Sequence, residues 1–409
     1  MLRGLEDDFA ITRRPYLLVL NIPYFIDSEG RMLLERAWHR DLVQHLRYLP
    51  HLMLAAPLHP LPADTTALVP VDNELRATLQ LFPLPSQRSR LGALVQFPWL
   101  IGALWRAVGR ADIVHTGIAG WPFPLGWLAS PIACLRGKKL LIVVESAPWR
   151  PLAKAATWRK KLESLAYEFL AKFWCSRADL SFYTQPRYLD QFHGSGKGPA
   201  YVVPATWVNA EEILDDAKAQ LLWDAKMAEP MRFLFVGRLV PEKGVQVLLE
   251  AVGKLCAVGA RAIVHIMGEG PLRDKMLAAE RKLPHCLKYF KPLAYGTPFF
   301  EFLQQYHAVI VPNLGDEQPR IIFDAAARAV PVLASDTDGL RPYVVDDCTG
   351  NLVTPDDSKA LADAIAFWTA NPKIVRSFAI EALSHVRSKT HQAMHAKRSQ
   401  IIARYLTAH

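Results

Sequence analysis

The sequence predicts an α/β protein built from two doubly wound parallel sheets, and three observations support this fold class. Short apolar runs, typical of strands buried on both faces, alternate with longer stretches of helical periodicity. The alternation occupies residues 16–203 and starts again at 232. About half of the 409 residues are hydrophobic, so the chain can bury two cores. We expect domains at 1–205 and 206–387, facing each other across a cleft, with a linker near 206–230.

In the first half, the apolar runs predict parallel strands joined by helices. The first helix is expected near 31–47, where Leu34, Trp38, Leu42 and Leu46 recur at helical spacing. The expected strands are 16–21, 51–56, 112–115, 140–144, 180–183 and 201–203.

In the second half, the same pattern predicts another parallel sheet followed by terminal helices. The expected strands are 232–236, 261–267, 287–290, 308–311, 332–334 and 350–353. The expected helices include 245–255, 359–369, 372–386 and 390–408.

Composition and charge limit the function classes. A net charge of +9 suits an anionic partner, either nucleic acid or anionic lipid, but no nucleic-acid-binding motif is present. The five cysteines form no CxxC pair or close Cys/His cluster, which favours a reducing compartment and gives no sign of zinc. The apolar stretch 91–105 is too short to span a membrane, and 115–135 is broken by prolines. Acidic residues at 6–8 argue against a signal peptide, so we expect a cytoplasmic protein.

Two cations follow the strand expected at 232–236. The run ends at Gly237, Arg238 and Lys243 come next, and a helix begins near 245. Ligands bind at the carboxyl edge of open parallel sheets, and guanidinium and ammonium groups bind phosphate oxygens. The pair therefore fits an anionic diphosphate, although a surface loop with two solvated cations explains the same pattern.

A carboxylate pair brackets the start of a later helix. Asp316 is expected in the preceding loop, and Asp324 about one turn into the helix. Carboxylates accept hydrogen bonds from vicinal hydroxyls, which both ribose and hexose present. The pair therefore predicts a site for sugar hydroxyls.

Together these motifs resemble the retaining GT-B glycosyltransferases of the glycogen synthase-like group, the glycosyl transferases group 1 family. The resemblance is strong over 232–357 and weaker in the first half of the chain, where it depends on 111–115, 178–180 and 202–204. The motifs in the strong part are Gly-Arg-Leu at 237–239, Glu-Lys-Gly at 242–244, Gly-Glu-Gly at 268–270, the carboxylate pair, and Val-Pro-Val-Leu-Ala-Ser-Asp at 330–336.

The resemblance implies two Rossmann-like domains, the first binding the acceptor and the second binding a nucleotide-sugar donor. It also implies that a C-terminal helix at 388–409 crosses back onto the first domain. Arg238 and Lys243 match the pair that neutralises the donor diphosphate. No metal or other cofactor is expected if these cations stabilise the leaving group.

The backbone near Lys291, Pro292 and Leu293 matches the region that receives the nucleotide base.

The acidic loop matches the family with departures. By resemblance, Asp324 holds the ribose and Asp316 contacts the transferred sugar, where the family usually has glutamates. Pro319 removes a backbone N–H from this loop, and Glu317 becomes the first acid if the register differs by one residue. In the first half, Gly117 stands where the family often has a histidine. These departures place the sugar pocket in doubt more than the phosphate site.

Two residues of the first half are further candidates for the catalytic site. Glu145 follows the strand expected at 140–144, and its alternative is a capping or linker-facing carboxylate. His115 lies at the end of an expected strand, and the alternative interpretation is a structural histidine whose hydrogen bonds are satisfied there. Neither is expected to act as a base, because in retaining transfer the leaving phosphate oxygen is thought to deprotonate the acceptor while the enzyme orients both sugars.

The segment from Lys154 to Trp174 predicts an amphipathic helix with a basic edge. The pattern fits a helix packed on the core, and it also fits contact with an anionic lipid monolayer. The second interpretation places the protein peripherally on the inner face of the cytoplasmic membrane. The apolar positions are Trp158, Leu162, Leu165, Phe169 and Phe173, and the cations are Arg159, Lys160, Lys161 and Lys172.

The sequence thus predicts a retaining glycosyltransferase that moves a sugar from a nucleotide-sugar donor to a glycan or lipid-linked glycan acceptor in surface polysaccharide biosynthesis. A catalytically silent relative that binds nucleotide-sugar or glycan as an assembly subunit is the alternative, favoured by the altered acidic loop. A nicotinamide oxidoreductase is disfavoured, because no GxGxxG motif opens the first strand.

Overall fold

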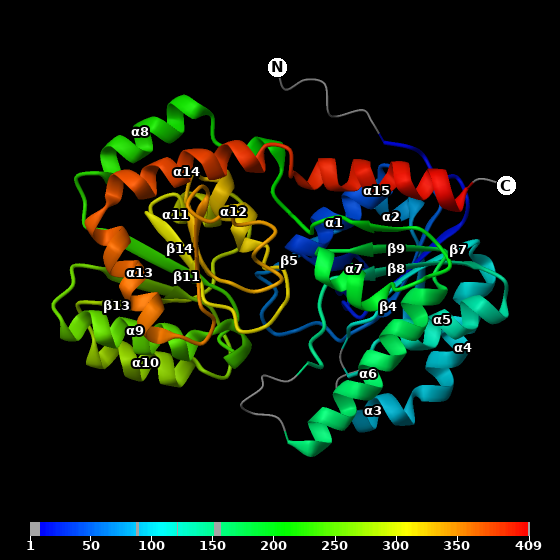
Figure 1. The fold of residues 1–409 in the computed structure, drawn as a ribbon. Helices are drawn as coiled ribbons and strands as arrows, with labels where there is room; N and C mark the ends of the chain where they lie inside the picture. The colour runs from blue at the N-terminus through cyan, green and yellow to red at the C-terminus, as the bar shows by residue number, and fades with distance from the viewer. Residues whose placement is uncertain (1–8, 87–89, 121, 151–156, 408–409) are drawn as a thin grey trace. The chain divides into compact units, whose positions relative to one another are not determined.

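The chain divides into two compact units (Figure 1). Unit 1 comprises Met1–Ala205 and Gln392–His409, and unit 2 comprises Thr206–His391. The computed structural model describes residues 9–407 except 87–89, 121 and 151–156.

Unit 1 contains a parallel sheet with strand order β10-β9-β8-β7-β1-β4-β6. The strand that contains Tyr16 pairs in parallel on both sides, with Tyr16 in register with Leu52 and Ile113. The strands are β1 (Tyr16–Val19), β4 (Leu52–Pro57), β6 (Gln80–Leu84), β7 (Ile113–Gly117), β8 (Lys139–Val144), β9 (Leu180–Tyr183) and β10 (Ala200–Val202).

Successive side chains of a strand point to opposite faces of the sheet, and in unit 1 helices bury both faces. Leu17 contributes to a core with helix α4, whereas Leu18 contributes to a separate core with helices α1 and α15. The sheet is therefore doubly wound, as predicted. The helices are α1 (Arg36–Leu46), α2 (Asn73–Thr78), α3 (Arg90–Val95), α4 (Phe97–Arg110), α5 (Gly126–Leu135), α6 (Trp158–Arg177), α7 (Pro186–Phe192) and α15 (His391–Leu406).

The prediction of a helix over 31–47 was wrong for its first turn. Met32–Glu35 forms strand β3, which pairs antiparallel with β2 (Phe25–Ile26) and β5 (Leu68–Pro70). Met32, Leu33 and Leu34 are consecutive buried residues, so this run packs as a strand, and the helix begins at Arg36. The strand β6 was also missed, because Pro83 interrupts its apolar pattern at the edge of the sheet.

Unit 2 contains a second parallel sheet with strand order β13-β12-β11-β14-β15-β16. Every strand expected in the second half is present, with ends that differ by two residues at most. The strands are β11 (Arg232–Val236), β12 (Ile263–Met267), β13 (Leu287–Phe290), β14 (Ala308–Val311), β15 (Val332–Ser335) and β16 (Gly350–Val353).

Helices cover both faces of this sheet as well. Phe233 and Phe235 pack in a core with α9 and α13, whereas Leu234 packs in a core with α11 and α12. The strand β11 lies centrally, so the loop that follows it reaches the middle of the carboxyl edge. The helices are α8 (Asp216–Lys226), α9 (Val245–Ala257), α10 (Arg273–Lys282), α11 (Thr297–Leu303), α12 (Ile321–Ala327), α13 (Ser358–Ala370) and α14 (Pro372–Val386).

The last helix, α15, belongs to unit 1 although it follows unit 2 in the sequence. Met394, Ile402 and Leu406 are buried in the unit 1 core that contains β1. The hydroxyl of Tyr201 donates to that of Tyr405 at 2.7 Å.

Among the described residues, no helix combines the length and the apolarity needed to cross a bilayer.

Candidate functional site

The loop after β11 is held by close backbone contacts. Gly244 has φ of 67°, and a Cβ there would lie 1.8 Å from the carbonyl oxygen of Pro312. The backbone N–H of Leu314 donates to the carbonyl of Glu242 at 2.9 Å. Only glycine fits this position, because a side chain would clash and the left-handed backbone would strain it. The contact fixes the short turn Pro241–Lys243 against the loop after β14.

Lys243, predicted from sequence as a phosphate ligand, forms an ion pair with Glu317, the alternative first acid. Lys243 Nζ lies 2.5 Å from Glu317 Oε1, and both side chains are partly buried. Arg238 lies on the same loop and is exposed. The structure thus joins the β11 loop to the acidic loop through one cation and one carboxylate.

A pocket of about 110 Å³ opens beside Lys243 in unit 2. Val236 and Val311, the last residues of β11 and β14, line it. The pocket therefore lies at the carboxyl edge of the parallel sheet, where ligands bind in open α/β folds.

Two polar residues of this pocket, Asn313 and Arg320, were missed by the sequence reasoning. Asn313 is 2% exposed, and its Nδ2 has no hydrogen-bond partner among the described residues. Buried amide groups are normally paired, so this N–H group is available to a ligand. Asn313 follows β14 by two residues, and the argument from strand ends that identified Arg238 could have found it.

Arg320 precedes α12 and lines the same pocket. Its Cζ lies 3.4 Å from the centroid of the Trp207 ring, a cation–π contact that holds the guanidinium in place. No sequence signal relates Trp207 to Arg320, because they are distant in the chain.

The carboxylate pair occupies two different environments. Asp316 lies half-buried in the loop before α12, and Asp324 is 5% exposed within α12, as predicted. Asp324 Oδ1 accepts a hydrogen bond of 2.7 Å from the hydroxyl of Tyr295. Tyr295 stands near Trp207, with ring centroids 6.1 Å apart. Asp324 is therefore held in a fixed orientation by an aromatic neighbour that the sequence did not reveal.

The segment predicted to receive the base follows β13. Lys291, Pro292 and Leu293 are exposed and lie outside regular secondary structure. Tyr295, two residues further on, connects this segment to Asp324. The segment expected to receive the base therefore lies close to Asp324, the residue expected to hold the ribose.

His115 lies in the core of unit 1. It is 7% exposed, sits in the middle of β7, and its Nδ1 is 2.9 Å from the hydroxyl of Tyr16. Burial, with repulsion from His45 as a second cause, holds the pKa of His115 well below its usual value. This environment favours a neutral, satisfied histidine over contact with a substrate.

Glu145 directly follows β8 and is exposed, as expected for a strand end. Its carbonyl accepts a hydrogen bond of 3.3 Å from the hydroxyl of Thr184. Its carboxylate is therefore open to solvent at the carboxyl edge of the unit 1 sheet.

The basic helix α6 differs from the core-packed interpretation. Trp158, Leu162, Leu165 and Phe169 are all exposed, and only Ala171 and Cys175 are buried in this helix. Residues 154–156 of the predicted segment lie outside the described residues. The apolar face of the helix thus lacks a covering element among the parts of the chain that the structure describes.

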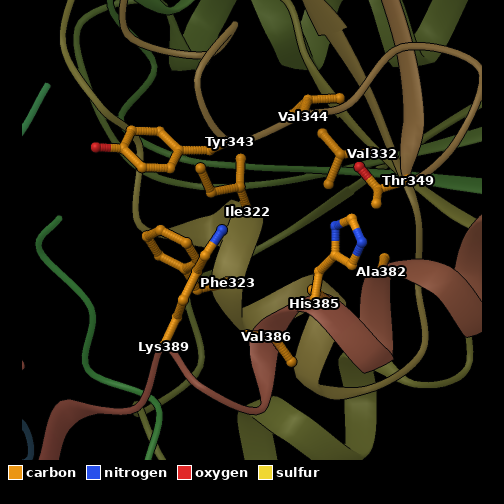
Figure 2. A pocket seen from close by; sticks show the side chains of 11 residues that line it. Ile322, Phe323, Val332, Tyr343, Val344, Thr349, Ala382, His385, Val386 and Lys389 are labelled. Atoms are coloured by element: carbon orange, nitrogen blue, oxygen red, sulfur yellow. The ribbon is translucent and has the colours of Figure 1, made fainter. Parts of the chain in front are cut away.

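A second pocket in unit 2 is shown in Figure 2. Its volume is about 20 Å³, room for a water molecule but not for a sugar. Burial lowers the pKa of Lys389, which lines it beside Tyr343. His385, also in its wall, has Cys348 and Glu381 as neighbours, with potential ligand atoms within 4.8 Å of one another. None of these residues was a predicted site residue.

Comparisons with known proteins agree with this architecture. Residues 230–371 match the family Glycosyl transferases group 1. Phosphatidyl-myo-inositol mannosyltransferase of Mycolicibacterium smegmatis is 31% identical over 159 residues, which cover 38% of this chain and 40% of that protein. The chain therefore spans less than half the length of this curated relative.

Two solved structures cover nearly the whole chain. Sucrose-phosphate synthase of Thermosynechococcus elongatus has a TM-score of 0.72 at 17% identity, covering 97% of this chain and 100% of that chain. HepE of Anabaena, in complex with UDP-glucose, has a TM-score of 0.65 at 14% identity, covering 95% and 99%. Residues 230–371 are thus similar to the Glycosyl transferases group 1 family, and the chain as a whole has the GT-B fold.

Proposed function

We propose that this protein is a retaining glycosyltransferase that moves a sugar from a nucleoside diphosphate to a glycan acceptor in surface polysaccharide biosynthesis. The pocket at the carboxyl edge of the unit 2 sheet carries the proposal. Its lining includes the cationic residues Lys243 and Arg320 and also Asn313, whose amide Nδ2 has no partner among the described residues. These are donors that suit phosphate oxygens, and two of them are cationic.

Arg238 and Lys243 stabilise the charge that grows on the diphosphate as the glycosidic bond breaks. In the transfer, the bond from the sugar C1 to the phosphate oxygen breaks, and a bond from C1 to the acceptor oxygen forms. The proton of the acceptor hydroxyl passes to the departing phosphate oxygen. No protein base is assigned to this step, in keeping with the buried, neutral state of His115.

The acidic residues bind the two sugars of the donor. Asp324, oriented by Tyr295, accepts hydrogen bonds from the ribose hydroxyls. Asp316 contacts the transferred sugar, and the exposed segment from Lys291 to Leu293 receives the base. No metal is assigned a role, because the cations supply the positive charge that the leaving group needs.

We further propose a lipid-linked acceptor and a peripheral position at the inner face of the cytoplasmic membrane. The exposed apolar and basic face of α6 supports this proposal. A relative named as a phosphatidyl-myo-inositol mannosyltransferase also supports it.

The function is tested first by ligand binding and then by turnover. Purified protein is screened for thermal stabilisation by UDP, GDP and ADP, where a ligand at a hundred times its Kd stabilises by about 2.7 kcal/mol. The matching nucleotide-sugars are then supplied with acceptor glycans, and NMR of the product reports the anomeric configuration. Inversion of that configuration would overturn the retaining assignment, and absence of binding to every nucleotide would overturn the function.

A catalytically silent binding subunit is the second candidate, and the Lys243–Glu317 ion pair favours it. Glu317 places a carboxylate on the cation that would otherwise receive phosphate. Nucleotide binding without transfer or hydrolysis of any nucleotide-sugar would select this alternative. Release of nucleoside diphosphate that depends on Arg238 would exclude it, with Arg281→Ala on the exposed surface of α10 as the matched control.

A further inference from the structure

Among the described residues, helices α3, α4 and α6 of unit 1 each expose several large apolar side chains to solvent. Trp99 on α4 is 72% exposed and Trp158 on α6 is 70% exposed, although such rings are usually well buried. Soluble monomers rarely leave apolar side chains of this size gathered on neighbouring helices. The exposed set comprises Leu91, Leu94 and Val95 on α3, Phe97, Trp99 and Trp105 on α4, and Trp158, Leu162, Leu165 and Phe169 on α6. We call these residues the apolar helix surface.

The apolar side chains of α6 lie on one face of the helix. Trp158, Leu162, Leu165 and Phe169 follow one another at intervals of four, three and four residues, which is helical spacing. The buried residues of this helix, Ala171 and Cys175, lie near its C-terminal end. Its first three turns therefore present an amphipathic surface that nothing covers within the described residues.

The helices that carry the surface form one layer of unit 1. Arg136, at the end of α5, lies over the ring of Trp105 on α4 at 4.4 Å. Trp127 of α5 contacts Tyr167 of α6, with ring centroids 4.3 Å apart. Figure 1 draws α3 and the first turns of α6 at the same end of this layer.

The charges around the apolar helix surface are mostly positive, with the exposed Glu163 on α6 as an exception. Residues 90–110, which include α3 and α4, contain no aspartate or glutamate. Arg159, Lys160 and Lys161 are exposed in the first turn of α6, and Arg106 is exposed on α4. The surface thus combines exposed tryptophans with cations, the pairing found where proteins meet the headgroup region of a bilayer.

We propose that α3, α4 and the first turns of α6 bind the surface of a bilayer that contains anionic lipids. Trp99, Trp158 and the leucines enter the boundary between headgroups and acyl chains, while Lys160 and Lys161 meet lipid phosphates. The proposal deepens the lipid-linked acceptor proposed above, because it names the membrane-binding residues and adds α3 and α4 to α6. A second copy of the chain fits the surface less well, since a symmetric contact would bring like charges together.

Co-sedimentation with vesicles tests the proposal without any acceptor or donor. The full chain is mixed with vesicles of phosphatidylcholine alone or with 30% phosphatidylglycerol, at low and high salt. We expect binding only to the anionic vesicles, weakened by salt. Lys160→Gln with Lys161→Gln should weaken binding roughly thirty-fold, since each cation near the surface contributes about five-fold.

A separate variant, Trp99→Ala with Leu162→Gln, should weaken binding at low and high salt alike, because it removes apolar contact rather than charge. The matched controls lie in unit 2. Arg281→Gln with Lys282→Gln removes two positive charges, as the Lys160 and Lys161 variant does, but from a different surface. Leu221→Gln removes an apolar side chain that is 69% exposed. Both controls should bind vesicles like the unchanged chain.

Nucleoside-diphosphate binding and thermal unfolding are measured on the same samples. Loss of vesicle binding with nucleotide binding retained supports the proposal independently of the proposed reaction. Failure of the unchanged chain to bind anionic vesicles overturns it, as does binding that neither unit 1 variant alters. Oligomers that the apolar variant dissociates, with vesicle binding unchanged, would assign the surface to a second copy and also overturn it.

Discussion

The substitution Glu317→Gln tests whether Lys243 belongs to the diphosphate site. Lys243 Nζ and Glu317 Oε1 are 2.5 Å apart, so in the ligand-free protein the carboxylate occupies one side of the ammonium. A nucleoside diphosphate must displace or share that cation. Glu317→Gln removes the competing charge while it keeps the shape of the side chain. We therefore expect Glu317→Gln to strengthen nucleoside-diphosphate binding and Lys243→Ala to weaken it.

The size of both effects follows from the exposure of the pair. The side chains of Lys243 and Glu317 are 15% and 28% exposed, and partly exposed ion pairs contribute about 0.2–1 kcal/mol. Glu317→Gln should therefore raise affinity by up to about five-fold. A hydrogen bond to a charged group contributes about 1.5–3 kcal/mol, so Lys243→Ala should lower affinity roughly 10- to 150-fold.

Isothermal titration calorimetry measures these changes with the best-bound of UDP, GDP and ADP and with its parent nucleoside. Only the diphosphate should respond to either substitution, because the nucleoside lacks the charge that Lys243 meets. Glu250→Gln on α9 is the control for loss of an exposed carboxylate. Equal weakening of diphosphate and nucleoside by Lys243→Ala would refute the phosphate assignment.

The same variants decide the register of the acidic loop. If Glu317 contacts the transferred sugar, Glu317→Gln should abolish transfer and Asp316→Asn should not. If Asp316 is the first acid, the pattern should reverse.

Three further predictions concern the ribose, a buried lysine and the last helix. Asp324→Asn should leave the fold intact and weaken binding of UDP more than that of 2′-deoxy-UDP, while Tyr295→Phe, which keeps the carboxylate, should have a smaller effect in the same titration. Burial lowers the pKa of Lys226 to about 7, so the unfolded chain binds more protons between pH 7 and its unfolded pKa near 10.4, and stability should rise with pH in that window. Lys226→Met should remove this pH dependence, a slope of roughly 1 kcal/mol of unfolding free energy per pH unit, measured by urea unfolding at pH 7, 8 and 9. An unchanged slope would contradict the lowered pKa of Lys226. Deletion from Thr390 onward should lower hydrogen-exchange protection in β1 and β8 of unit 1, because α15 supplies Ile402 and Leu406 to their core, and unchanged protection would exclude that role.

Most of the fold could be predicted because its strands are buried on both faces. Such strands read as continuous apolar runs, and Phe233 to Val236 is clear without any knowledge of its neighbours. The small antiparallel sheet could not be predicted in this way. Leu34 and Trp38 fit a helical period by chance, although the first lies in a strand and the second in a helix. A short strand that runs directly into a helix leaves no boundary that periodicity can detect.

The candidate site was predictable where it depends on strand ends and not where it depends on packing. Arg238 and Lys243 follow β11 in the chain, so their place at the sheet edge follows from the order of elements. The contacts of Arg320 with Trp207 and of Asp324 with Tyr295 join residues that lie far apart in sequence. These contacts depend on how the loops pack against one another, so no local sequence pattern predicts them.

The α6 helix shows why amphipathicity alone does not locate a helix. The spacing of Leu162, Leu165 and Phe169 predicts that one face avoids water, but protein core and lipid satisfy that requirement equally well. Neighbouring elements decide between them. In unit 1 the sheet face beneath α6 is already filled by the core of α4 and α5, which leaves only the C-terminal turns of α6 to be buried. The α6 face has three cations in its first turn and no covering element within the described part of the chain, so the anionic bilayer that we propose as its partner suits both its charge and its tryptophans.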